Sequence, residues 1–243
     1  MAKEDRMVGD LEYRALLAAD IEHSAGRGDP ALRRIRDVLF TELRASVEYS
    51  GIDWDGCVRR DLGDGMVLTA PRGTPLTSLI QPLTAQLSQR LRAHNRESSE
   101  LTRVRARVVV HAGHVRVEDD TVTGQPLEVL ARLLDAPNAK KALLDAPQSV
   151  SVALLVSQHV HDEAVQHGYL GIDPDDFHRI PITVKEYSGY GWLHLPGAGA
   201  ISLGTAPVEP DEVRSKMVNK ASGHGTIIAN QGGDQNFRIT KRS

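Results

Sequence analysis

The sequence predicts an α+β fold, a β-sheet with helices on one of its faces. Short apolar stretches of strand type alternate along the chain with longer stretches in which apolar residues recur every three or four positions. Residues 13–196 give the order strand, helix, hairpin, helix and strand. This order is close to the ferredoxin-like βαββαβ arrangement, in which helices cover one side of the sheet.

The first strand and the first helix have clear sequence signals. Residues 13–19 are mostly apolar and lead into Asp20, which predicts a buried strand. We expect the helix to begin with Asp29 as its N-cap and Pro30 at the first helical position. Gly51 is expected to end this helix.

A hairpin and a second helix are expected next. Residues 58–60 and 66–69 flank the Gly-Asp-Gly sequence of residues 63–65, which is typical of a tight hairpin turn. Leucines spaced by four predict the second helix, which Pro82 either delays or kinks. These leucines are Leu79, Leu83, Leu87 and Leu91.

The strongest strand signal spans residues 104–111. Arginines alternate there with apolar residues, so we expect the arginines on the solvent side of the strand. Gly113 predicts a turn, and residues 115–118 a companion strand. The arginines are Arg103, Arg105 and Arg107. The remaining predictions are helices at 126–134 and 138–144, a strand at 150–156, a helical segment at 158–166, and a terminal hairpin of 180–185 with 191–195.

Composition favours an intracellular globular protein. The 243 residues carry a formal net charge of −3, which gives no basic field for nucleic acid or an anionic membrane. The single cysteine, Cys57, excludes an internal disulfide framework and a cysteine-rich zinc site. His111 has no partner at zinc-ligand spacing, so packing is its expected role. The apolar runs are too short to cross a bilayer and no signal peptide is apparent, so we expect a cytoplasmic location.

The composition changes after Pro196. Residues 198–243 are rich in Gly, Asn and Gln and have no helical or strand period of useful length. We therefore expect a folded domain at residues 1–197 and a flexible tail at residues 198–243. The stretch 223–236 is then available to bind a protein partner.

Two carboxylates are expected where strands end. Asp20 follows the first strand, and Asp64 lies in the hairpin turn. Carboxylates that converge from neighbouring strands are a usual way to hold Mg²⁺ or Mn²⁺ against a nucleoside triphosphate. Either aspartate alone is also an ordinary helix cap or turn residue, so the prediction depends on the pair.

Four segments in one order resemble the catalytic core of class III nucleotidyl cyclases, the adenylate and guanylate cyclases. The segments are Asp20-Ile21-Glu22-His23-Ser24, Gly63-Asp64-Gly65, Val108-Val-Val-His111-Ala-Gly113 and residues 124–133. The resemblance spans residues 13–196 and implies a nucleoside triphosphate substrate and a 3′,5′-cyclic nucleotide product. It also implies two Mg²⁺ or Mn²⁺ ions and a head-to-tail homodimer with its sites between subunits.

The resemblance also implies roles for individual residues. Asp20 and Asp64 match the metal carboxylates, with the carbonyl of Ile21 as a backbone ligand. Arg132 matches an arginine that stabilises the transition state, and Lys185 a lysine that contacts the triphosphate. Backbone amides after the first strand are the implied phosphate ligands. These amides belong to Ile21, Glu22, His23 and Ser24.

Three positions depart from the family pattern. Glu128, four residues before Arg132, stands where the family usually has asparagine. Arg60 and Gln125 stand where the family reads a purine with lysine and aspartate. These departures leave the identity of the substrate's base undetermined. They are compatible with a pyrimidine cyclase in a signalling or defence role. The alternative is a catalytically degenerate nucleotide-binding module that retains the fold.

Overall fold

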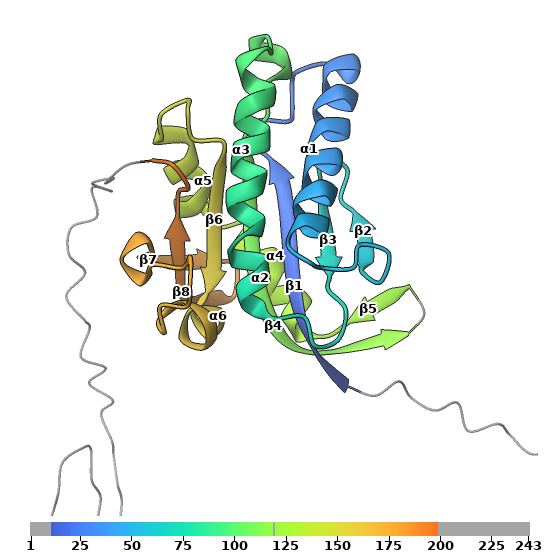
Figure 1. Ribbon diagram of the computed structural model, residues 1–243, viewed down its shortest axis with the longest axis vertical. Helices are drawn as coiled ribbons and strands as arrows, with labels where there is room; N and C mark the ends of the chain where they lie inside the picture. The colour runs from blue at the N-terminus through green and yellow to red at the C-terminus, as the bar shows by residue number, and fades with distance from the viewer. Residues whose placement is uncertain (1–10, 119, 199–243) are drawn as a thin grey trace, which may run out of the picture. The chain divides into compact units, whose positions relative to one another are not determined.

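The computed structural model describes residues 11–118 and 120–198. This part of the chain forms one sheet of eight strands between two layers of helices (Figure 1). The strand order is β2-β3-β1-β4-β6-β8-β7, and β5 pairs with β4. The strands are β1 (Leu11–Ile21), β2 (Val58–Asp61), β3 (Gly65–Thr69), β4 (Ala106–Glu118), β5 (Thr121–Thr123), β6 (Val152–Ser157), β7 (His178–Val184) and β8 (Tyr187–His194).

The helices lie on both faces of the sheet because the central strands are apolar on both faces. Leu17 and Ala19 of β1 join the core beneath the first helices, while Leu16 and Ala18, which point the other way, are also fully buried. The first layer contains α1 (Asp29–Tyr49), α2 (Leu76–Ile80) and α3 (Leu83–Arg96), and the second contains α4 (Gln125–Leu134) and α5 (Pro137–Asp145). A short α6 (Gln158–Val160) continues into a π-type turn at His161–Val165.

The predicted α+β class and ferredoxin-like order are therefore confirmed. The helices predicted at 126–134 and 138–144 form as α4 and α5, but they cover the opposite face of the sheet, where helices were expected on one face. Pro82 separates α2 from α3, and the terminal hairpin forms from β7 and β8 as expected. Helix α1 begins one residue earlier than predicted, with Gly28 as its N-cap and Asp29 in its first turn. The predicted tail falls almost wholly outside the described residues and stays a prediction.

The pairing of β1 with its neighbours places the acidic turns together. β1 pairs antiparallel with β3 on one side and with β4 on the other, and β4 pairs parallel with β6. In this register Asp20 lies opposite Gly65 of β3 and opposite Arg107 of β4. The turn between β2 and β3, which contains Asp64, therefore reaches the end of β1.

Gly65 allows this close approach of the two strands. A Cβ atom at this position would lie 2.2 Å from the carbonyl oxygen of Ala19 and 2.9 Å from the Cα of Asp20. Both neighbouring atoms belong to the backbone and cannot rotate away. The turn can therefore sit against Asp20 only with glycine at position 65.

Gly113 has a different role from the predicted one. No turn occurs there, because β4 continues through Gly113 to Glu118, and the companion strand is β5. A Cβ atom at Gly113 would lie 2.6 Å from Cγ of Pro126 in α4. The glycine therefore serves the close packing of a helix on a strand, which the sequence pattern alone does not distinguish from a turn.

The prediction that three arginines of this segment face solvent is wrong for two of them. Arg103 is exposed, whereas Arg105 is 6% exposed and the side chain of Arg107 14%. Strand β4 is central and both of its faces are covered. The alternation of arginines with apolar residues therefore does not indicate a solvent-exposed face here. The two arginines are buried because each has an acidic partner: Glu22 for Arg105 and Asp20 for Arg107.

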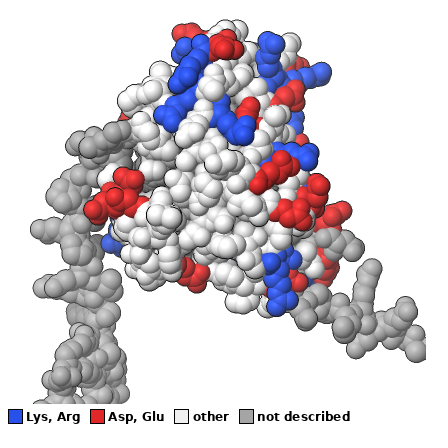
Figure 2. All heavy atoms as spheres, viewed as in Figure 1, with Lys and Arg blue, Asp and Glu red and all other residues white. Residues whose placement is uncertain are grey.

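Charged side chains of both signs are interleaved on the face shown in Figure 2. Basic residues gather toward the upper ends of α1 and α3, and acidic residues lie among them along the right-hand side. This face has no unbroken basic surface of the kind that follows a nucleic-acid backbone.

The close backbone approach at Gly65 should make the fold sensitive to a single added methyl group. Gly65→Ala should lower the free energy of unfolding by about 3 kcal/mol, because backbone atoms must move apart. Gly63→Ala, in the same turn but with open space around its Cβ position, should cost only about 1 kcal/mol, from its positive φ. Urea unfolding of both variants measures the difference, and equal losses would contradict the close-approach account.

Candidate functional site

Asp20 and Asp64 lie close to each other where the end of β1 meets the β2–β3 turn. The amide of Ile21 donates to the carbonyl oxygen of Asp64 over 3.1 Å, which joins the end of β1 to the β2–β3 turn. The hydroxyl of Ser24 donates to Oδ2 of Asp64 over 2.5 Å. Two carboxylates, a hydroxyl and backbone carbonyls are thus gathered from two segments of the chain, residues 20–24 and the β2–β3 turn.

Asp20 already has a cationic partner. Arg107 donates from Nε to Oδ1 over 2.8 Å and from Nη2 to Oδ2 over 2.5 Å, so the contact is bidentate. Burial raises the pKa of Asp20, and the nearby charge of Asp64 also raises it, whereas Arg107 and Lys140 act in the opposite direction. Asp20 is only 8% exposed, and the guanidinium offsets the free-energy cost of removing its carboxylate from water.

The donors present fit a hard divalent cation in their chemistry. Asp20, Asp64 and the Ile21 carbonyl offer oxygen ligands, the type that Mg²⁺ and Mn²⁺ prefer. In the described part of the chain no group of three or more His, Cys, Asp or Glu side chains converges as a metal site. Water and phosphate oxygens would therefore have to complete the ligand set, and Arg107 would have to yield at least one oxygen of Asp20.

Only part of the segment after β1 can bind phosphate through its amides. The Ile21 amide is used by Asp64, and the Glu22 amide donates to the Arg105 carbonyl over 2.8 Å. Within the described residues the amides of His23 and Ser24 have no acceptor. The predicted four donors are thus reduced to these two.

The side chain of Glu22 is a structural anchor. Its Oε2 lies 3.3 Å from Nη1 of Arg105, and both side chains are 7% exposed. Arg105 also donates to carbonyl oxygens of Leu143, Ala146 and Val150, at the end of α5 and the start of β6. The pair fixes the β1–α1 connection to the rest of the sheet.

Arg132 and Lys185 come together in a second group. Arg132, near the end of α4, contacts Glu186 with 2.7 Å between Nη2 and Oε1. Glu186 and Lys185 form the turn between β7 and β8, where Lys185 has a φ of 53°. A bond from its own backbone amide and the Arg132 contact lower the pKa of Glu186. Glu128 lies one helical turn before Arg132, but the arginine pairs with Glu186 instead.

The structure does not bring the two predicted base-reading residues together. Arg60 lines a hollow of about 160 Å³ with Asp120, Thr121 and Leu127. Gln125 lines a different cavity of about 540 Å³, beside histidines and Tyr187. Sequence reasoning missed the contribution of the β4–β5 connection to the hollow beside Arg60. The position of this connection opposite β2 depends on the length of β4.

His111 is a packing residue within the sheet. Its Nδ1 lies 2.8 Å from the hydroxyl of Ser157, and it is 9% exposed. Burial, and to a lesser extent His159, lowers the pKa of His111 to about 4. A contact that sequence reasoning missed adjoins it: the Tyr13 hydroxyl donates to Glu163 over 2.6 Å and lies 2.8 Å from Nε2 of His159.

Comparison with solved structures identifies the fold. An adenylate/guanylate cyclase/hydrolase from Silicibacter pomeroyi matches with a TM-score of 0.57 and 18% identity, covering 77% of this chain and 99% of that one. The guanylyl cyclase Cya2 matches with a TM-score of 0.53 and 12% identity, covering 81% and 100%. A bacterial light-regulated adenylyl cyclase matches with a TM-score of 0.52 and 12% identity, covering 77% and 52%.

The described domain therefore has the fold of adenylate and guanylate cyclase domains. The sequence itself matches no family model and no curated protein. No helix among the described residues is both long and apolar enough to cross a membrane.

The buried His111 predicts a dependence of stability on pH. The unfolded chain binds a proton at this residue near pH 6.5, whereas the folded protein does so only near pH 4. The free energy of unfolding should therefore fall as the pH decreases through this window, by about 2 kcal/mol between pH 7 and pH 5. Urea unfolding at the two pH values measures the loss. His111→Gln should reduce the loss to the part that arises from His194, whose pKa burial also lowers. His167→Gln, at an exposed position, should retain the full loss; the same loss in both variants would show that His111 is not its source.

Proposed function

We propose that this chain is a cytoplasmic nucleotidyl cyclase that converts a nucleoside triphosphate to a 3′,5′-cyclic nucleotide and pyrophosphate. In this reaction the ribose 3′-oxygen bonds to the α-phosphorus, the link to the β-phosphate breaks, and the 3′-hydroxyl proton is lost. The observation that carries the proposal is the convergence of Asp20 and Asp64 at adjacent strand ends, in the fold of cyclase domains.

Two Mg²⁺ or Mn²⁺ ions would polarise the α-phosphate, favour ionisation of the 3′-hydroxyl and neutralise the leaving pyrophosphate. In the proposal Asp20, Asp64 and the Ile21 carbonyl hold these ions. Ser24 keeps Asp64 oriented through its 2.5 Å hydrogen bond. Arg107 then gives up part of its contact with Asp20, and a triphosphate offers the guanidinium a replacement anion.

The remaining substrate contacts come from the segment that follows Asp20 and from the group that contains Arg132 and Lys185. The amides of His23 and Ser24 are assigned to phosphate oxygens, because they are the uncommitted donors of the β1–α1 connection. Lys185 and Arg132 are assigned to the triphosphate and to the charge that develops in the transition state. Arg132 must then exchange its contact with the exposed Glu186 for the phosphate.

A homodimer explains why these residues occur in two places. Among the described residues, no hydrogen bond or ion pair connects the Asp20–Asp64 group with the Arg132–Lys185 group. In a head-to-tail pair, the first group of one subunit faces the second group of its partner. Each dimer then contains two complete sites.

The base is assigned to the hollow beside Arg60. Its other polar lining residues are Arg59, Thr69, Asp120 and Thr121. Of these, Asp120 and Thr121 replace Gln125 as the residues expected to read the base edge. Arg60 and Asp120 combine a cation with a carboxylate, as a lysine and an aspartate do, and Thr121 adds a hydroxyl that can donate or accept. The proposal therefore includes both a purine and a pyrimidine as the base, with the cyclic product acting in signalling.

The second candidate is a nucleotide-binding module without turnover. The bidentate contact of Arg107 with Asp20 favours it, since the carboxylate is already neutralised without a metal. Glu128, on α4 one turn before Arg132, also favours it, because a carboxylate there repels an anionic substrate. The two candidates differ in whether product forms.

The carboxylate pair predicts a direct assay. Wild-type protein with Mn²⁺ and ATP, GTP, UTP or CTP should yield a 3′,5′-cyclic product detected by mass spectrometry. Asp20→Asn and Asp64→Asn should each lower the rate at least about 100-fold, because removal of one charged ligand disrupts the metal site. Asp37→Asn, at an exposed position of α1, is the matched control. Nucleotide binding without product from any substrate would favour the binding module over the enzyme.

The shared site predicts complementation between inactive variants. Asp20→Asn and Arg132→Ala should each be inactive as homodimers, because each lacks one half of both sites. Equal mixing should restore roughly a quarter of wild-type activity, since half of the dimers are mixed and each has one intact site. Absence of recovery, with mixed dimers demonstrated by native mass spectrometry, would place all the residues in one subunit.

A further inference from the structure

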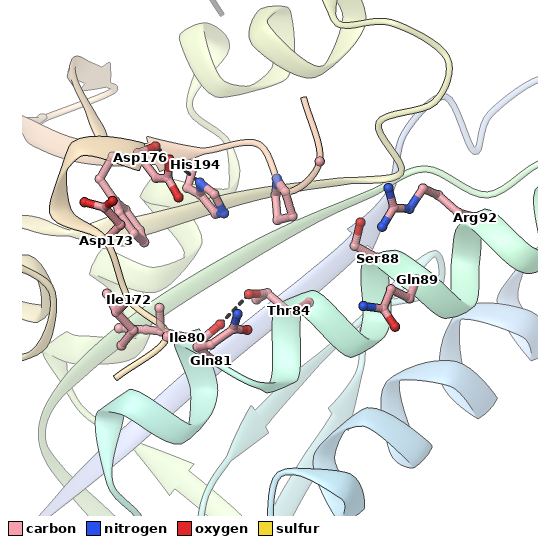
Figure 3. Close-up of a pocket in the computed structure, with 15 residues that line it drawn as sticks. Ile80, Gln81, Thr84, Ser88, Gln89, Arg92, Ile172, Asp173, Asp176 and His194 are labelled. Carbon is pink, nitrogen blue, oxygen red and sulfur yellow. Dashed lines mark hydrogen bonds between the residues drawn. The ribbon is translucent and has the colours of Figure 1, made fainter. Parts of the chain in front are cut away.

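A cavity separate from the Asp20 region lies between α3 and the segment that leads into and out of the final hairpin (Figure 3). Its volume is about 240 Å³. One wall is the α2–α3 junction and α3, and the opposite wall is the stretch 171–177 together with the end of β8. None of the residues assigned to the cyclase reaction lines it. The polar lining residues are Gln81, Thr84, Ser88, Gln89, Arg92, Asp173, Asp176 and His194.

The floor of this cavity contains buried polar atoms without partners. Ser88 is 0% exposed and its hydroxyl has no hydrogen bond, although a serine in a helix can bond to the preceding turn. Oε1 of Gln81 is also buried and unpaired. Thr84, between them, instead donates to the carbonyl of Ile80. An unsatisfied buried oxygen costs about 1–3 kcal/mol, so two on one surface require an explanation.

Opposite charges stand at the two ends of the cavity. Figure 3 shows Arg92 at one end and Asp173 and Asp176 at the other, with Thr84 and Ser88 on α3 between them. Within the described residues none of these three charged side chains forms an ion pair. The guanidinium lies against Gly197, where a Cβ atom would be 2.7 Å from its Nη1. The glycine leaves room for the arginine at the rim.

His194 adds an acceptor to the acidic end. Its Nδ1 lies 3.2 Å from the carbonyl oxygen of Asp176, and its ring stacks on Phe177 with 5.0 Å between centroids. Burial lowers the pKa of His194, so the ring is neutral at pH 7. With Nδ1 donating to the carbonyl, Nε2 is an acceptor. The acidic end is therefore rich in acceptors, and the opposite end has the donors of Arg92.

We propose that this cavity binds a small zwitterion, with its anionic group at Arg92 and its ammonium group at Asp173 and Asp176. Each end presents the charge that the corresponding ligand group requires. A ligand with one charged group would satisfy one end only. The proposal is independent of the cyclase reaction, because it uses different residues.

The proposal is tested with three probes that share one carbon chain. These are 6-aminohexanoate, hexanoate and hexylamine, titrated into the full-length protein and followed by calorimetry and by ¹H–¹⁵N chemical shifts. We expect 6-aminohexanoate to bind at least about tenfold more tightly than either single-charge probe, with shifts at residues 84–92 and 171–177. Equal affinities of the three probes, or shifts confined to other parts of the protein, would overturn the proposal.

Two variants separate the contributions of the two ends. Arg92→Gln should remove the advantage of 6-aminohexanoate over hexylamine, and Asp176→Asn should reduce its advantage over hexanoate. Arg96→Gln, on the same helix but outside the cavity, should bind like wild type. An amide spectrum like that of wild type identifies the variants that remain folded. If Arg92→Gln binds the zwitterion as tightly as Arg96→Gln does, the assigned orientation is wrong.

Discussion

The register between β1 and β4 is the constraint on which the candidate site depends. It places Asp20 directly opposite Arg107 on a face of the sheet covered by α4 and α5, so that a carboxylate and a guanidinium are buried together. Neither is stable there alone, because an unpaired buried charge costs several kcal/mol. The ion pair keeps the Asp20 carboxylate charged at the end of the strand. A stronger cation at Asp20, or an anion that competes for Arg107, is needed to separate the two side chains.

The same sheet distributes the other candidate residues. Gly65 lets the β2–β3 turn contact the end of β1, while the Glu22–Arg105 pair holds the connection that follows. On the other side, the β7–β8 turn meets α4 through Glu186 and Arg132. The first group contributes two carboxylates and the second an arginine and a lysine, which would make them complementary in the proposed dimer.

Much of the fold could be predicted from local sequence signals, because hairpin, helix-start and periodicity signals act over a few residues. The α1 start, the β2–β3 turn and the β7–β8 hairpin were found in this way. The errors arose where tertiary packing decides the role of a residue or the direction of its side chain. Gly113 marks a helix contact instead of a turn, and Arg105 and Arg107 point into a covered face because acidic partners 83 and 87 residues away, Glu22 and Asp20, meet them there.

We propose that Asp20 and Asp64 form a divalent-cation site and that Arg107 competes with the ion for Asp20. It is tested most directly by the affinity for Mn²⁺ in the absence of nucleotide, measured by electron paramagnetic resonance at pH 8 for wild type and Arg107→Gln. We expect the variant to bind Mn²⁺ roughly three- to tenfold more tightly, because the ion no longer displaces a guanidinium from Asp20. Unchanged or weaker binding in a folded Arg107→Gln variant would contradict it.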